Sequence, residues 1–209
     1  IRIGDWSSDV CSSDLAEQRD RRIFLMAFEK YLVDYCSPTL ASVKTANLFN
    51  WFYESSTELW EQVSYWNLLM NPKGVYLYVL KEHPKKALIY VCRKSRLAEN
   101  LSRPGVAAFL AGYGYGELDV DAAIERLKSR FDKGEDFPHE IGVFLDYPLG
   151  DVIGFIENSG HNYKCSGCWK VYCDECESRR LFAMYQKCRD IYTRLYEQGR
   201  SVFQLTVAA

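Results

Sequence analysis

The stretch of residues 139–176 reads HEIGVFLDYPLGDVIGFIENSGHNYKCSGCWKVYCDEC, and the rest of the chain is interpreted outward from it. Its first apolar run, residues 141–145, predicts a short strand, and the glycine within it indicates close approach of another backbone or a ligand. An aspartate-tyrosine-proline sequence then predicts the cap of a helix that ends at Ser159-Gly160. Residues 168–172 predict a second strand.

Residues 139–176 are called the corner below, and the chain before them predicts helices and one hairpin. Aromatic residues at helical spacing predict a helix over residues 16–35, and Ser37-Pro38 predicts the start of a short helix over residues 38–44. Two continuous apolar runs joined by a polar loop predict an antiparallel hairpin. The expected strands are 46–53, 75–80 and 87–92, and the expected helices are 58–70, 94–100, 104–111 and 119–130.

These elements predict an α+β fold with a mainly antiparallel sheet of about four to five strands covered by helices. The hairpin and the two strands of the corner are expected in one sheet. The last helix is expected to begin after Asp174, because Glu177 three residues later completes a capping box. A length of 209 residues and a hydrophobic share of 48% are compatible with a single domain over residues 16–209.

Residues 1–15, IRIGDWSSDVCSSDL, have no helical or strand period and no apolar core typical of a signal peptide. They resemble the translation of a sequencing adapter. We therefore expect an artefactual or disordered tail that packs on nothing.

Composition narrows the classes of function. A net charge of −2 provides no basic field, so nucleic acid is not an expected partner. No apolar run approaches the roughly 18 residues of a membrane span, so no membrane segment is expected. Without Cys11 the cysteines are odd in number and mostly clustered, which favours reduced thiols in a cytoplasm over a disulfide framework.

Four cysteines form the first candidate site. Cys165 with Cys168 and Cys173 with Cys176 are two chelating pairs, and thiolates select zinc or an iron–sulfur cluster. If the intervening residues 169–172 are extended, they separate the pairs by about 13 Å. Alternation along that strand also directs Cys173 away from Cys168. A metal site is therefore an alternative interpretation and not the favoured one.

A second interpretation is an enzyme. His139 and Glu140 precede the first strand of the corner, and a histidine beside a carboxylate can transfer protons. Cys176 near a helix N-terminus could act as a nucleophile. No H-E-x-x-H pattern follows His139, so a structural role for this pair stays open.

The third interpretation, and the favoured one, is a binding protein. A pocket between sheet and helices would be lined by tyrosine and tryptophan with few polar groups, with Tyr147, Lys170 and Tyr172 converging on it. The expected helix start at Ser37, with Thr39 and Lys44 close by, could hold an anion, although a plain helix cap explains these residues as well.

The corner string resembles a bacterial family filed as domain of unknown function 3793, and so do CSPTLASVKTANLF at residues 36–49 and SVFQLTVA at residues 201–208. The resemblance covers nearly all of residues 16–209. It implies a cytoplasmic protein of mainly anaerobic bacteria, in an iron or redox context, with no assigned activity. We therefore expect an accessory protein that binds a small molecule or a protein partner.

Overall fold

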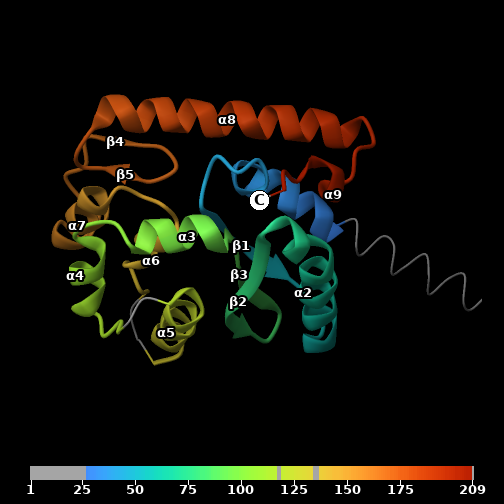
Figure 1. Ribbon diagram of the computed structural model, residues 1–209, viewed down its shortest axis with the longest axis horizontal. Coiled ribbons are helices and arrows are strands. Elements are labelled where there is room, and N and C mark those ends of the chain that lie inside the picture. The colour runs from blue at the N-terminus through green and yellow to red at the C-terminus, as the bar shows by residue number, and fades with distance from the viewer. Residues whose placement is uncertain (1–26, 117–118, 134–136, 209) are drawn as a thin grey trace, which may run out of the picture.

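The computed structural model describes residues 27–116, 119–133 and 137–208. These residues form an α+β fold, with one three-stranded antiparallel sheet, one two-stranded antiparallel sheet and helices around them (Figure 1). The tail expected at residues 1–15 lies outside the described part of the chain.

The described elements follow one another in the order helix, strand, helix, hairpin, helices, small hairpin, long helix, short helix. Residues 27–40 are helical. The remaining elements are β1 Ala46–Phe52, α2 Ser56–Met70, η1 Asn71–Lys73, β2 Val75–His83, β3 Lys86–Arg93, α3 Lys94–Leu101, α4 Val106–Ala111, α5 Val120–Lys133, α6 Ile141–Phe144, α7 Leu149–Glu157, β4 Cys165–Ser166, β5 Lys170–Val171, α8 Glu175–Glu197 and α9 Val202–Leu205.

The larger sheet has the order β1-β3-β2. The expected hairpin is confirmed, because β2 and β3 pair antiparallel from Val75 opposite Arg93 to His83 opposite Lys86. The strand expected at residues 46–53 is also confirmed, as β1, which pairs antiparallel with β3. The continuous apolar runs of the hairpin are explained by burial on both faces of the sheet.

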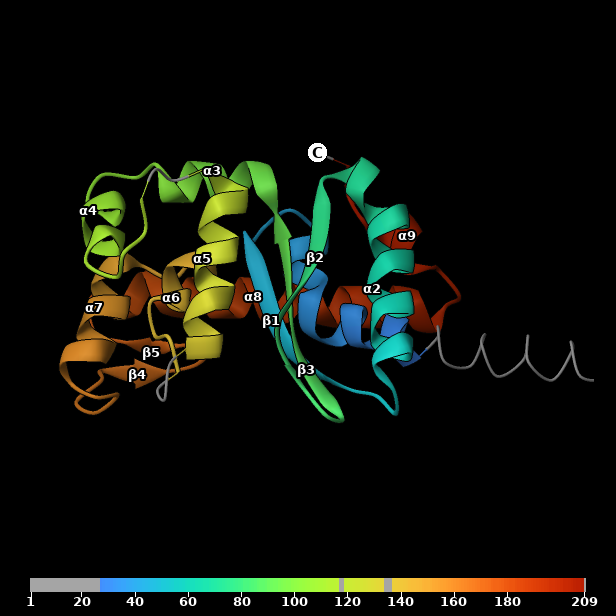
Figure 2. The same ribbon diagram turned by 90° about the horizontal axis from the view of Figure 1, so that it is seen from below.

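Helices cover both faces of this sheet, as the edge-on view shows (Figure 2). One core lies between the sheet, α2 and the helix 27–40, and centres on Phe28, Trp51 and Trp66. The other lies between the sheet and α3 to α7, and centres on Tyr90 and Phe144. Apolar burial on both sides is the main driving force for this layered arrangement.

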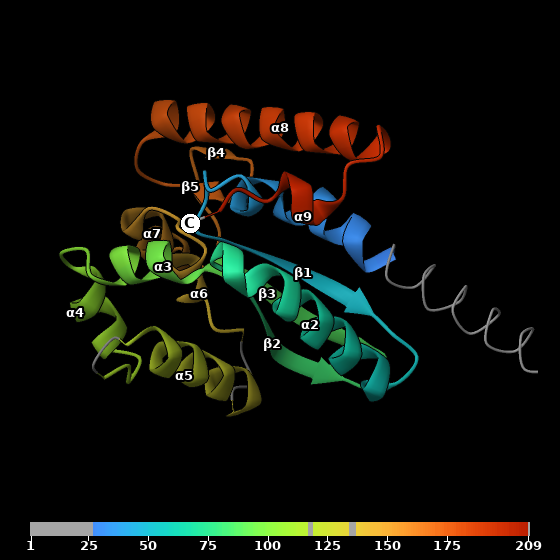
Figure 3. The same ribbon diagram turned by 45° about the vertical axis from the view of Figure 1, so that its right-hand side comes forward.

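Helix α8 connects the two ends of the molecule. It begins after Asp174, whose side chain accepts a hydrogen bond from the Glu177 amide at 2.9 Å, so the expected helix start and its Asp174 cap are confirmed. In Figure 3 α8 extends from the β4–β5 hairpin to α9, beside the helix 27–40. Tyr192 joins the first core and Tyr185 joins a small cluster with Trp169 and Val171 of the hairpin.

The strand expected at residues 141–145 is wrong, because residues 141–144 form the helical turn α6. A short apolar run has the same pattern in a buried strand and a buried helix, so periodicity cannot separate them. Here the surroundings select the helix. Tyr90 donates a hydrogen bond to the Phe144 carbonyl at 2.7 Å, and Asn100 donates to the Val143 carbonyl at 2.5 Å.

The strand expected at residues 168–172 is shorter than predicted and lies in another sheet. Only β5 is extended, and it pairs with β4 in a separate hairpin, with Cys165 opposite Val171. The predicted count of four to five strands in one sheet is therefore wrong, since the larger sheet has three strands. The hairpin forms its own satellite core under α8 instead of extending the sheet.

The short helix expected over residues 38–44 is also wrong. The first helix continues through Ser37 and Pro38 to residue 40, and the Ser37 hydroxyl donates to the Val33 carbonyl within it. The buried Arg93 explains this continuation, because its guanidinium donates to the Thr39 carbonyl at 2.6 Å and the Leu40 carbonyl at 2.7 Å. These bonds satisfy carbonyls that a helix end leaves without partners.

Candidate functional site

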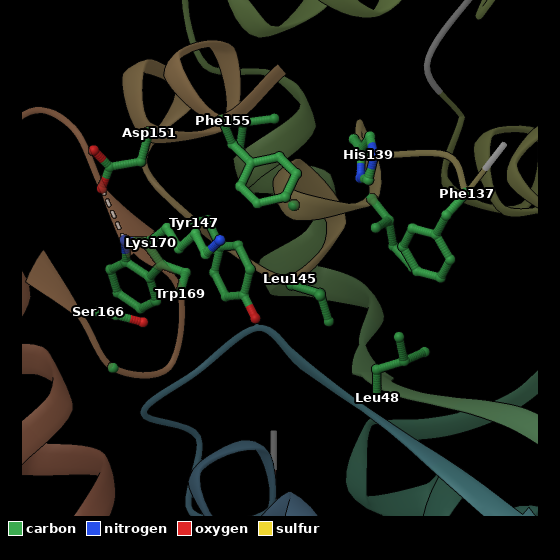
Figure 4. Close-up of a pocket in the computed structure, with 14 residues that line it drawn as sticks. Leu48, Phe137, His139, Leu145, Tyr147, Asp151, Phe155, Ser166, Trp169 and Lys170 are labelled. Carbon is green, nitrogen blue, oxygen red and sulfur yellow. Dashed lines mark hydrogen bonds between the residues drawn. The ribbon is translucent and has the colours of Figure 1, made fainter. Parts of the chain in front are cut away.

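Asp151 ties α7 to the β4–β5 hairpin. It is only 2% exposed, and its carboxylate accepts three hydrogen bonds of 2.8 Å, from the Trp169 indole and from the backbone amides of Tyr172 and Cys173. Buried charge is costly unless it is fully hydrogen-bonded, and these donors meet that requirement. The bond to Trp169 is drawn in Figure 4.

Two glycines of α7 let the hairpin approach this closely. A Cβ atom at Gly150 would lie 2.4 Å from the Cys173 sulfur, and one at Gly154 would lie 2.6 Å from Cγ of Tyr172. The two glycines are four residues apart, so they share one face of the helix. The sequence LGDVIGF therefore provides a smooth helix face with the hydrogen-bonding Asp151 beside it.

Tyr147 occupies the centre of the corner. The preceding Asp146 has a left-handed backbone with φ of 63°, and its carboxylate accepts a hydrogen bond from Thr45 at 2.8 Å. This turn places the Tyr147 ring on Trp169, with ring centroids 4.9 Å apart and planes at 28°. The Tyr147 hydroxyl donates to the Cys168 carbonyl at 3.3 Å.

A first cavity of about 320 Å³ opens on one side of Tyr147 (Figure 4). Its walls are mostly apolar and aromatic, and the polar side chains on them belong to His139, Ser166, Lys170 and the fully bonded Asp151. The complete lining is Leu48, Phe137, His139, Ile141, Gly142, Leu145, Tyr147, Asp151, Val152, Phe155, Ser166, Gly167, Trp169 and Lys170.

A second cavity of about 780 Å³ adjoins the first, because Leu48, Leu145, Tyr147 and Gly167 line both. Its other walls come from the end of the first helix and the loop after it, from β1, from the turn between β4 and β5, and from α8. They are formed by Tyr35, Pro38, Lys44, Asn47, Cys168, Phe182, Ala183, Tyr185, Gln186 and Arg189.

Lys44 is the buried charge of this second cavity, with 3% of its surface exposed. Its ammonium donates to the Ala46 carbonyl and lies 5.3 Å from the centroid of the Tyr147 ring. Burial lowers the pKa of Lys44 from 10.5 to about 8; Asp146 opposes this shift and Arg189 adds to it. The side chain is therefore predominantly protonated at neutral pH.

The six expected ligand-binding residues are not brought to one place. Lys44 and Tyr147 meet at the second cavity, and Tyr147 and Lys170 line the first. Thr39 donates to the Asn47 side chain at 2.8 Å, and Ser37 bonds within its helix. Tyr172 donates to the His161 carbonyl at 2.9 Å. No helix begins near Ser37, so an anion there would not meet the free amides of a helix N-terminus as expected.

The expected proton-transfer pair is separated. Glu140 is 1% exposed and accepts a 2.8 Å ion-pair bond from Arg130, with the Tyr115 hydroxyl at 3.4 Å. His139 is exposed, and its ring lies 4.9 Å from that of Phe155 between centroids. Glu140 is thus committed to a buried ion pair, while His139 faces the first cavity.

The four clustered cysteines differ in their surroundings. Cys165 and Cys168 are half-buried in the hairpin, whereas Cys173 and Cys176 are exposed. Cys176 lies in the first turn of α8, as expected. Within the described ranges, no three His, Cys, Asp or Glu side chains are grouped so as to hold a metal ion.

Sequence reasoning missed several residues of the site. Asp151, which holds the hairpin, is not among the site residues that the sequence pattern singled out. Arg189 lies four residues after the buried Tyr185 on α8, and residues at this spacing share one face of a helix. That spacing is the feature of the sequence that indicates Arg189 beside a packed face. Leu48 and Phe137 reach the first cavity from outside the corner, and nothing local in the sequence indicates this.

The fold and the site define an α+β protein with paired cavities between its sheet, a hairpin and its longest helix. Residues 32–206 match the family described as "Protein of unknown function (DUF3793)", so the chain belongs to that family. No curated protein and no solved structure matches the chain. No helix in the described ranges is both long enough and apolar enough to cross a membrane.

Proposed function

We propose that this chain is a binding protein whose first cavity holds a small, largely apolar molecule. The observation that carries the proposal is the cavity of about 320 Å³ with aromatic walls and few polar side chains. Such cavities are typical of small-molecule sites, where apolar walls supply affinity and a few polar groups fix orientation. His139, Ser166 and Lys170 are the polar groups available for orientation.

The walls are held in place before any ligand arrives. Trp169 is fixed by its bond to Asp151 and by the Tyr147 and Phe182 rings, whose centroids lie 4.9 and 4.5 Å from its own. Lys170 donates to the Gly160 carbonyl at 2.7 Å. A preformed pocket loses little conformational entropy on binding, so more of the contact energy is retained as affinity.

Catalysis and metal binding have less support. The Glu140 carboxylate is engaged by Arg130, which leaves His139 without the carboxylate partner that proton transfer was expected to use. Cys176 remains the alternative nucleophile, and the clustered cysteines remain the alternative zinc or iron–sulfur ligands. We include an iron or redox context in the proposal on the family resemblance alone.

A neutral aromatic probe, 1-naphthaleneacetamide, tests the first cavity by isothermal titration calorimetry. Its 14 or so non-hydrogen atoms at about 0.3 kcal/mol each correspond to roughly 4 kcal/mol of binding free energy. The expected Kd is therefore about 1 mM or tighter, with one probe per chain.

Ser166→Trp fills the cavity from the hairpin and should abolish binding of this probe. Ser64→Trp places the same side chain on the exposed face of α2 and should leave binding unchanged. Absence of saturable binding to the unaltered chain, or equal binding to both variants, would overturn the proposal.

A further inference from the structure

The lining of the second cavity carries positive charge that no acidic side chain of the same lining balances. Lys44 and Arg189 both line it, and none of its fourteen lining residues, all within the described chain, is acidic. Two like charges on one cavity wall repel each other; Arg189 lowers the pKa of Lys44, by less than Asp146, which is not part of the cavity lining, raises it. A bound anion would remove that repulsion and offset the cost of burying the ammonium.

The Lys44 ammonium also has unused hydrogen-bonding capacity. It carries three donors, and its interactions within the described chain are the bond to the Ala46 carbonyl and the contact with the face of the Tyr147 ring. It forms no ion pair with any carboxylate of the described residues. A buried ammonium that lines a cavity and retains donors is suited to a charged oxygen ligand.

The carboxylate with the largest electrostatic effect on Lys44, that of Asp146, has other bonding partners. Asp146 accepts a hydrogen bond from Thr45 at 2.8 Å and forms an ion pair with Arg103 at 3.2 Å. Asp146 thus has partners of its own outside the second cavity, and it is not part of the lining of that cavity. The positive charges of Lys44 and Arg189 on the cavity wall are therefore available to a ligand.

We infer that the ligand is an anion whose apolar part occupies the first cavity and whose carboxylate or phosphate oxygens bind Lys44 and Arg189 in the second. This inference rests on the proposed function of the first cavity. Its geometric basis is the set of four lining residues that the cavities share, with Tyr147 at their junction and in contact with both Trp169 and Lys44.

A matched pair of probes tests the charge separately from the apolar part. 1-Naphthaleneacetate and 1-naphthaleneacetamide have nearly the same shape, and only the first carries a negative charge. A charge-assisted bond to a buried ammonium should make the acetate bind about tenfold more tightly than the amide at neutral pH. Titration calorimetry at fixed ionic strength measures this ratio.

Lys44→Met should reduce the ratio to about three, because an apolar side chain of similar length replaces the buried cation and leaves Arg189 as the remaining cation of the cavity. Arg189→Gln should reduce it about threefold, and this half-exposed position provides a second variant if Lys44→Met does not fold. Lys187→Gln removes a charge from an exposed position of α8 and should leave the ratio unchanged.

The outcomes separate the two proposals. If neither probe binds the unaltered chain, the proposed function itself fails. If the amide binds in the first cavity but the acetate binds no more tightly, the inferred anion site is refuted and the first proposal stands. A tighter acetate whose tenfold advantage is unchanged in both Lys44→Met and Arg189→Gln would also refute the anion site.

Discussion

Replacing Asp151 by alanine should separate the β4–β5 hairpin from α7. The substitution removes the acceptor of three hydrogen bonds, from the Trp169 indole and from the amides of Tyr172 and Cys173. Asp151 is also the side chain that fixes Trp169 as a wall of the first cavity. Stability and probe binding should therefore fall together.

The magnitude follows from where the three donors lie. Trp169 is buried, so its indole N–H would lose its partner away from water, at a cost of about 1–3 kcal/mol. The amides of Tyr172 and Cys173 belong to half-buried and exposed residues, so water can replace part of what they lose. Together with the loss of hairpin packing, we expect unfolding free energy to fall by about 4 kcal/mol.

Urea unfolding followed by circular dichroism measures this loss, and a change of this size corresponds to a Tm lower by about 8–16 °C. Asp190→Ala is the matched control, because Asp190 is exposed on α8 and accepts a hydrogen bond from the exposed Gln186. The control should change the unfolding free energy by less than about 0.5 kcal/mol.

A loss below about 1 kcal/mol in Asp151→Ala would refute the reasoning, since each buried bond to a carboxylate should contribute more than that. Unchanged binding of 1-naphthaleneacetamide in a folded Asp151→Ala chain would refute the claim that this residue holds the cavity wall.

Three further predictions concern other buried groups. Burial lowers the pKa of Lys44 in the folded chain to about 8, from an ordinary 10.5, so the buried charge costs stability below pH 8 and this cost is relieved as the pH rises toward 10.5. Between pH 8 and pH 10.5 the unfolding free energy of the unaltered chain should therefore rise, relative to that of Lys44→Met, by up to about 1.4 kcal/mol per pH unit. Arg130→Ala leaves the buried Glu140 carboxylate without its ion-pair partner and should cost about 3 kcal/mol in urea unfolding. Iodoacetamide should label the exposed Cys176 in the folded chain and label Cys36 only on unfolding, because burial raises the pKa of the Cys36 thiol well above its usual range.

Each of these has a control or a contrary result. A flat difference between the unaltered chain and Lys44→Met from pH 8 to 10 would contradict the lowered pKa. Arg180→Ala removes an exposed ion pair with Glu177 and should lower the unfolding free energy by less than about 1 kcal/mol. If Arg130→Ala lowers the unfolding free energy by no more than Arg180→Ala does, burial of the Glu140 ion pair contributes nothing to stability. Equal labelling of Cys36 and Cys176 in folded protein would show that the first helix opens readily.

The sequence alone determined the elements whose pattern is local. The hairpin of β2 and β3 follows from two apolar runs around a polar loop, and the start of α8 follows from Asp174 and Glu177. Tyr185 and Tyr192 are both buried and lie on one face of α8, as helical spacing requires. Local hydrogen bonding and periodicity involve residues a few positions apart, so a single chain reveals them.

Tertiary contacts decided the rest. Residues 141–144 are helical because Tyr90 and Asn100 bond their carbonyls, and the first helix passes Pro38 because Arg93 bonds its last carbonyls. Those partners lie 43 to 54 residues away in the chain. The free energy of such contacts depends on which surfaces meet in the folded chain. The burial of Lys44 depends on the same surfaces, because lysine is ordinarily a surface residue and only the folded chain places this one on the wall of a cavity.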